Sequence, residues 1–389
     1  MDKVLSASFY SGCATVSVFL PIMLVSVLFD VFNPLILNIL YHSCSDCPEV
    51  AAIHAAVDML DSGSWNEQTS ASLDAVIRRA YEEMHILPRS NSLVWRELYT
   101  DASILRSLGD VLRLGSTQDE ALASSCVSKL DHAIVIAGAP GEGRLDIIYD
   151  AIHAVQHAMS RSEPPPDQSF FDGNDTPPVV LSRSLESAHQ PVPRLTSPPS
   201  LSLFVLQYSR QPFVIPGFIN DWPALNEHPW KSFAYLRSVS GPGRVVPVEI
   251  GDDYRDDDWT QKMMLWDDLL DALDPHKPHT SDKRKLYLAQ HNLFLQFPKL
   301  RDDILIPDYA YASLQPPKDF PGYRPPANED QLVLNAWLGP PCMASPAHTV
   351  SAASFILTLL LTRSNLRIHS STSTVRPLLG SISRALTVP

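Results

Sequence analysis

Apolar residues recur at helical spacing through most of residues 50–158. Hydrophobic side chains fall on one helical face in successive stretches, namely 53–60, 73–84, 98–112, 127–134 and 148–155. Breaker residues stand between these stretches, as in Ser62-Gly63-Ser64 and at Pro88 and Gly115. The pattern predicts an all-α domain of about five helices over residues 44–160.

From Phe204 onward the pattern changes to short apolar runs that are closed by turn residues. Such runs predict β-strands, and they occupy residues 212–215, 245–250, 286–290 and 332–337. Short helices are expected between them, at 230–239, 265–273 and 298–304. Strands of this length between turn signals are typical of a β-barrel or β-sandwich.

Two segments follow neither pattern. Residues 161–200 carry three Pro-Pro motifs among Asp, Ser and Arg, which predicts an extended, solvated linker. Residues 350–389 are rich in Ser, Thr and Leu and contain no acidic residue, and most of residues 362–389 are expected to lack regular structure. The chain is therefore expected to be an α+β multidomain protein.

The N-terminal residues 1–43 are strongly apolar. Residues 13–29 contain no charged residue, and a second apolar stretch follows Asp30 as far as Tyr41. A membrane-spanning helix needs ~20 apolar residues, so the first run is marginal in length. Two alternatives stay open: a membrane anchor formed by residues 13–40, and a buried or spurious N-terminal segment.

Composition narrows the class of partner. The formal net charge of −13 argues against a strongly basic surface that binds nucleic acid directly, but it is compatible with a basic protein partner. The chain has 34 prolines, which agrees with long linkers. Its five cysteines are too scattered for a disulfide framework, so a reducing compartment is expected.

Motifs in the β-rich half occur in a recognisable order. They are Pro212-Phe213-Val214-Ile215, Asp221-Trp222-Pro223-Ala224, the run from Arg244 to Gly251, the run from Tyr287 to Phe294, Ile306-Pro307-Asp308-Tyr309, and Asn335-Ala336-Trp337-Leu338-Gly339-Pro340. In this order and spacing they resemble the jumonji-C (JmjC) family of cupin-like oxygenases. The resemblance covers roughly residues 191–349.

The resemblance implies a fold and a chemistry. It implies that residues 201–349 are the N-terminal part of a JmjC domain, an incomplete double-stranded β-helix that follows the all-α domain. Members of the family are Fe(II)- and 2-oxoglutarate-dependent dioxygenases that hydroxylate an arginine or demethylate a lysine in a basic protein or histone tail. It further implies location in the nucleus or cytoplasm, whereas a genuine anchor would imply a membrane.

Matching residue by residue gives candidate site residues. His348 matches the first iron ligand, and Tyr287 and Ser345 match residues that contact 2-oxoglutarate. Glu249 and Trp259 match residues that line the substrate pocket. A carboxylate beside an aromatic face suits a guanidinium or a methylated ammonium.

The chain departs from the family pattern at the iron motif. The family places Asp two residues after the first His, but Val350 stands there and has no lone pair for a metal. No Asp or Glu follows Asp330, and His369 comes too soon to be the third ligand. The lysine that pairs with 2-oxoglutarate is also missing. We therefore expect no activity from the chain as written, and a non-catalytic binding or truncated protein is the alternative to an oxygenase.

The first prediction concerns the abrupt change at Val350. The codons for Val350-Ser351 are compatible with the nucleotides at the start of an intron, so we expect residues 350–389 to be translated intron or frameshifted sequence. Sequencing of the spliced transcript should show a message that leaves this reading frame after His348-Thr349. A cloned message that continues into Val350 would contradict the prediction.

Overall fold

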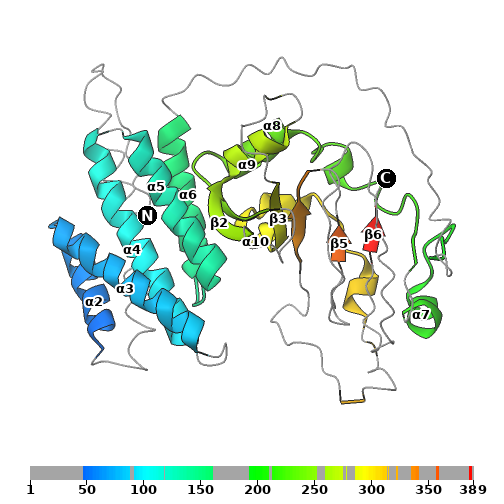
Figure 1. The fold of residues 1–389 in the computed structure, drawn as a ribbon, viewed down its shortest axis with the longest axis horizontal. Helices are drawn as coiled ribbons and strands as arrows, with labels where there is room; N and C mark the ends of the chain where they lie inside the picture. The colour runs from blue at the N-terminus through cyan, green and yellow to red at the C-terminus, as the bar shows by residue number, and fades with distance from the viewer. Residues whose placement is uncertain are drawn as a thin grey trace, which may run out of the picture. The chain divides into compact units, whose positions relative to one another are not determined.

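The structure is a computed structural model, and it separates the chain into two compact units. One unit comprises Met1–Pro166 with Pro242–Arg244, and the other comprises Asp167–Gly241 with Val245–Pro389. The residues that the structure describes are 47–87, 92–117, 119–160, 192–209, 213–251, 259–274, 277, 285–312, 314, 321–322, 334–340, 356–358 and 385–387. Figure 1 shows the helices of the first unit and the mixed helices and strands of the second.

Long helices make up the first unit (Figure 1). They are α2 (Pro48–Asp61), α3 (Glu67–Ile86), α4 (Leu93–Thr117), α5 (Glu120–His132), the π-helical turn η3 (Ala133–Ala137) and α6 (Arg144–Ser160). Asn66 caps α3 by accepting from the Thr69 amide at 2.9 Å, and Asp119 caps α5 in the same way. These polar caps satisfy amides that have no partner within the helix. Each periodic stretch that the sequence predicts lies within these helices, and the stretch 127–134 runs from α5 into η3.

The helical unit buries ion pairs as well as apolar stripes. Asp101 and Arg144, both 1% exposed, form a hydrogen-bonded pair at 3.0 Å. Asp131 is fully buried and accepts from Arg244 at 2.7 Å, which is why the short segment Pro242–Arg244 belongs to this unit. A buried charge is tolerated only when it is paired and hydrogen-bonded, so each of these contacts is a requirement of the local packing.

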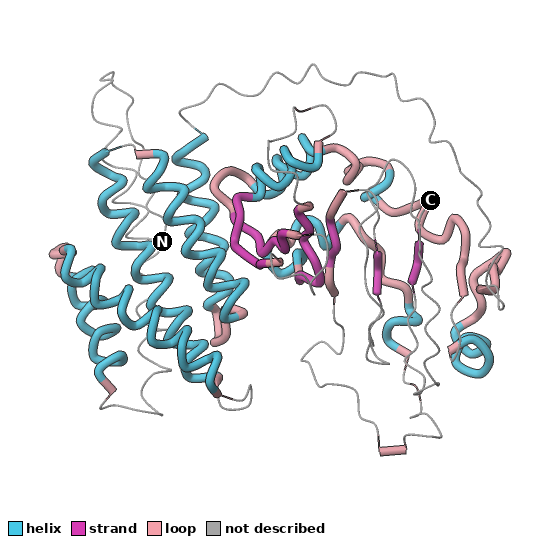
Figure 2. Tube along the Cα trace, viewed as in Figure 1, coloured by secondary structure: helices cyan, strands magenta, loops and turns pink. Residues whose placement is uncertain are grey.

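An antiparallel sheet lies at the centre of the second unit. It is formed by β1 (Val245–Ile250), β2 (Thr260–Leu265), β3 (Leu286–His291) and β4 (Ala336–Leu338), in the order β2-β1-β3-β4. Figure 2 shows these strands beside the short helices of the same unit. The short helices of this unit are α7 (Leu201–Leu203), η4 (Phe204–Tyr208), η5 (Pro223–Leu225), α8 (Phe233–Ser240), α9 (Trp266–Leu273), α10 (Leu293–Gln296), α11 (Lys299–Asp302) and η6 (Asp308–Tyr311), of which α8, α9 and α10 lie nearest the sheet.

Strand alternation gives the sheet two different faces. Val246, Val248 and Ile250 of β1 lie in the hydrophobic core together with residues of α8, α9, α10 and α11. Leu288 of β3 and Leu338 of β4 lie in the same core and face each other in the register. Residues between these positions point to the opposite side of the sheet, which we call the second face.

Several expectations need correction. β2 was not predicted as a strand, because its residues are mostly exposed and its polar and apolar residues form two successive groups that do not alternate. β4 is confined to Ala336–Leu338, shorter than the predicted 332–337 run. The described residues contain one four-stranded sheet and a parallel pair of β5 (Ile356–Thr358) and β6 (Ala385–Thr387), and among them no double-stranded β-helix is closed. The mixture of helices and antiparallel sheet agrees with the expected α+β class.

The end of the predicted linker is packed against the second unit. Arg194 forms an isolated bridge with Val214, and the Leu195 amide donates to the Val214 carbonyl at 2.8 Å. Phe204 follows in η4 and is fully buried, with its ring 4.7 Å from that of Tyr309. Linker residues 161–191 and the apolar segment 13–40 lie outside the described residues. Within the described ranges no helix is long and apolar enough to cross a membrane.

Asp303, at the end of α11, joins the start of α8 and the segment before it to the rest of the second unit. Its carboxylate is 1% exposed and accepts from Trp230 Nε1 at 2.8 Å and Tyr235 Oη at 2.6 Å, and it contacts His228 Nδ1 at 2.7 Å. Its carbonyl accepts from the Ala224 amide at 3.0 Å. Burial and the bond to this carboxylate raise the pKa of Tyr235, so the phenol remains a donor.

The second prediction tests this junction. Asp303→Asn replaces an oxygen that accepts hydrogen bonds with an NH2 group that faces other donors, so we expect the free energy of unfolding to fall by about 3 kcal/mol. Chemical denaturation followed by tryptophan fluorescence measures the change. Asp302→Asn is the control, because the exposed neighbouring carboxylate makes the same chemical change without burial. Equal stability of the two variants would contradict the role of Asp303.

Candidate functional site

Glu249 and Tyr287 lie opposite each other on the second face of the sheet. They are direct partners in the antiparallel register of β1 and β3, and both side chains are half-buried. Val248 and Ile250 flank Glu249 and point into the core, so the Glu249 side chain points away from it. Two of the residues that the sequence predicts for the site are therefore brought side by side.

Trp259, a third predicted site residue, joins this pair. It precedes β2 and its side chain donates a hydrogen bond to the Glu249 carboxylate. Gly251, at the end of β1, has φ +136°, and a Cβ there would lie 3.3 Å from the Trp259 Cα. The absence of a side chain at Gly251 therefore lets Trp259 approach the end of β1. The three residues Glu249, Tyr287 and Trp259 form a cluster that we call the Glu249 cluster.

The electrostatics of this cluster favour recognition of a cation. Partial burial raises the pKa of Glu249 above its ordinary value, and the hydrogen bond from Trp259 opposes this shift. Burial, with a contribution from the Glu249 charge, raises the pKa of Tyr287 to about 12. At neutral pH the Tyr287 phenol is therefore uncharged. The ionised Glu249 carboxylate beside it has no cationic partner among the three residues of the cluster.

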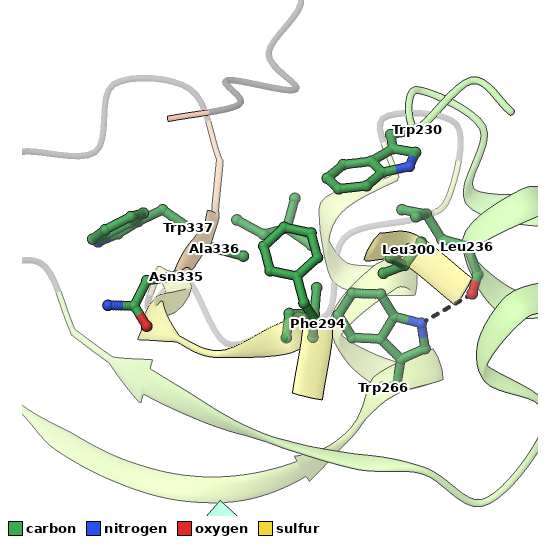
Figure 3. Close-up of a pocket in the computed structure, with 10 residues that line it drawn as sticks. Trp230, Leu236, Trp266, Phe294, Leu300, Asn335, Ala336 and Trp337 are labelled. Carbon is green, nitrogen blue, oxygen red and sulfur yellow. Dashed lines mark hydrogen bonds between the residues drawn. The ribbon is translucent and has the colours of Figure 1, made fainter. Parts of the chain in front are cut away.

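Trp337 lies on the same face, and sequence reasoning did not assign it to the site. Leu338 points into the core opposite Leu288, so its neighbour Trp337 points to the second face. In Figure 3, Trp337 and Asn335 lie on one side of the β4 strand and Phe294 lies on the other. The alternation in Asn335-Ala336-Trp337-Leu338 was the available signal, but it could not be oriented without knowing which face is buried.

A cavity of about 30 Å³ lies on the core face of the sheet (Figure 3). It is lined mostly by apolar side chains, among them Trp230, Trp266, Phe294 and Leu300, and residues 335–338 of the β4 segment also border it. This volume holds little more than one or two water molecules, so it is too small for 2-oxoglutarate or an amino-acid side chain. The cavity borders the hydrophobic core, whereas Glu249 and Tyr287 point to the other side of the sheet.

A β-bulge lies three residues beyond Tyr287. Leu288 pairs with Leu338 and His291 pairs with Ala336, so β3 advances by three residues where β4 advances by two. Gln290 within the bulge has φ +51°, in the left-handed region. This conformation costs a non-glycine residue about 1–3 kcal/mol and is found most often close to functional sites.

The remaining predicted site residues cannot be placed. Ser345, His348 and Val350 lie outside the described residues, so the structure does not test whether Ser345 and His348 approach Tyr287. Over the described part of the chain, no group of three or more His, Cys, Asp or Glu side chains could hold a metal ion. The candidate site that the described residues form is therefore the Glu249 cluster, and the iron site stays a prediction.

Comparison with known proteins gives a consistent set of relatives, although no family model matches the chain. The chain is 36% identical over 185 residues to Lysine-specific demethylase 8 of Danio rerio, which is 47% of this chain and 41% of that protein. It is 30% identical over 291 residues to Jumonji C domain-containing protein 5 of Drosophila melanogaster, covering 74% and 65% of the two chains. JmjC domain-containing protein D of Dictyostelium discoideum is 36% identical over 160 residues, or 40% and 35% of the two chains.

The aligned parts are less than two thirds of the length of these relatives, and less than half for the Danio and Dictyostelium proteins. Their names share the JmjC domain or lysine demethylation, and the same family is indicated by the motifs that surround Glu249, Tyr287 and Trp337. These similarities support an assignment of the chain to the family of JmjC domain-containing proteins.

Proposed function

We propose that the Glu249 cluster binds the cationic side chain of an arginine or a lysine in a basic protein segment, such as a histone tail. The cluster would be the substrate-binding side of a JmjC-type protein hydroxylase or demethylase. The observation that carries the proposal is the direct pairing of Glu249 with Tyr287, with Trp259 hydrogen-bonded to the same carboxylate. The names of the Danio and Arabidopsis relatives attribute lysine demethylation to those proteins.

The chemistry of the cluster fits a cation better than a neutral or anionic ligand. A carboxylate attracts a guanidinium or ammonium group, and the indole and phenol rings present faces to which cations are drawn. A guanidinium also donates in a planar fork that matches a carboxylate. Because Trp337 lies on the same face of the sheet, it offers a further aromatic surface for the same ligand.

Relationship to the JmjC family implies that the protein binds Fe(II) and 2-oxoglutarate. The side chains at the expected ligand positions of this sequence do not form an iron site. Three protein ligands, two His and one carboxylate, are needed to hold ferrous iron with open positions. His348 supplies one donor, Val350 replaces the carboxylate, and no Asp or Glu follows Asp330. We therefore derive no oxidation step for this chain and propose that, as written, it binds a substrate side chain without turning it over.

The third prediction tests cation binding. Glu249→Gln removes the charge but keeps the size of the side chain, so we expect the affinity for N-acetyl-arginine methylamide to fall about tenfold to a hundredfold, the loss of a charged hydrogen bond. Isothermal titration calorimetry gives the dissociation constant. Glu227→Gln, at an exposed position of the same unit, is the matched control and should bind as the parent does.

The pH dependence of binding follows from the raised pKa of Glu249. Only the ionised carboxylate attracts the probe, so affinity should already decline at a pH above 4.5 as the solution is acidified, and Glu249→Gln should bind weakly at every pH. Folding stability responds in the opposite sense, because a carboxyl with a raised pKa destabilises the folded state as it ionises. Probe affinity that does not change between pH 4 and pH 8 would contradict the role of Glu249.

The fourth prediction concerns iron. Replacing residues 350–389 with a JmjC C-terminal half that begins with Asp at position 350 restores the missing ligand types. We expect this chimera to bind about one Fe(II) per chain, and the chain as written to bind none, since the facial arrangement needs all three donors. Metal analysis after anaerobic loading and desalting measures the ratio. Stoichiometric iron together with consumption of 2-oxoglutarate by the chain as written would contradict the proposed inactivity.

A further inference from the structure

The bulge in β3 is connected to a buried polar contact on the core side of the sheet. His291, 9% exposed, places Nε2 2.8 Å from Oε1 of Gln296, which is fully buried at the end of α10. The amide nitrogen of Gln296 donates to the carbonyl of Val245, the first residue of β1. One side chain of α10 therefore joins the bulged end of β3 to the start of the strand that carries Glu249.

The partners fix the orientation of each group in this contact. The Val245 carbonyl can only accept, so the NH2 group of Gln296 must face it and Oε1 must face His291. Oε1 in turn can only accept, so Nε2 of His291 must carry a proton and donate. The contact thus requires a donor at the Nε2 position of residue 291, and a side chain that cannot place a donor there leaves buried polar atoms unsatisfied.

Which residues of β3 and β4 lie on the second face depends on the bulge beside the His291–Gln296 contact. If β3 and β4 paired regularly in the register of Leu288 and Leu338, His291 would point to the second face and Gln290 would point into the core. If Leu288 stays in the core and the two strands pair regularly in the register of His291 and Ala336, Trp337 stands opposite Gln290 on the core face and leaves the second face. Either change alters the surface beside Tyr287, and both would relieve the left-handed backbone of Gln290.

We propose that His291 and Gln296 are positioning residues for the second face: their buried hydrogen bonds hold the bulge that keeps Trp337 on the same side of the sheet as Glu249 and Tyr287. The inference rests on the proposed binding of a cationic side chain for its functional consequence. Neither residue touches the ligand in this arrangement. They act by fixing the register of β3 against β4 and the position at which β1 begins.

Two amide substitutions separate this role from general packing. A glutamine side chain can place its NH2 group where His291 has Nε2, whereas an asparagine is one methylene too short. We expect His291→Gln to bind N-acetyl-arginine methylamide within about twofold of the parent, and His291→Asn to bind about five- to tenfold more weakly, the equivalent of one hydrogen bond. Titration calorimetry measures both variants with the full chain.

Amide hydrogen exchange gives a second readout that does not depend on a ligand. Residues 286–291 and 336–338 should exchange faster in His291→Asn than in the parent, and at the parental rate in His291→Gln. Equal affinity and equal exchange for the two variants would overturn the proposal. If the parent chain does not bind the probe, the proposed function fails, while the exchange comparison still decides whether His291 holds the bulge.

Discussion

The buried carboxylate of Asp303 is the interaction on which the second unit depends. It lies at the end of α11, and its partners His228, Trp230 and Tyr235 lie about seventy residues earlier in the chain. A carboxylate removed from water is stable only when several donors replace the lost hydration. His228 and Trp230 precede α8 and Tyr235 lies in its first turn. Because α8 packs on the core face of the sheet, the same contact helps to fix how that face is covered.

Once one face of the sheet is covered by helices, the chemistry of the other face follows from strand geometry. Val248 and Leu288 fix the inward side of β1 and β3, and the residues beside them, Glu249 and Tyr287, are forced outward as direct partners. Trp259 then reaches the carboxylate because Gly251 leaves room for its backbone. A cluster suited to a cation thus arises from the same alternation that builds the core.

The buried polar groups of the two units have different consequences. In the helical unit, Asp101 and Arg144 satisfy each other inside one packed bundle, and their contact stabilises that bundle alone. In the sheet unit, Gln296 joins the start of β1 to the bulge of β3, so this core contact links two strands of the sheet. Buried polar contacts of this second kind specify a register as well as stability.

Sequence alone determined the succession of helices over residues 48–160 and the strands β1 and β3, because periodic burial is a local signal. The family motifs singled out Glu249, Trp259 and Tyr287 as candidate site residues. Sequence also determined that Val350 cannot ligate iron, since donor chemistry needs no coordinates. Only the tertiary structure decided that Thr260–Leu265 is an edge strand and that the Asp303 carboxylate is contacted by three polar side chains. It also decided that Trp337 shares a face of the sheet with Glu249. Each of these depends on contacts between residues far apart in the chain, and such partners leave no periodic trace in the sequence that could identify them.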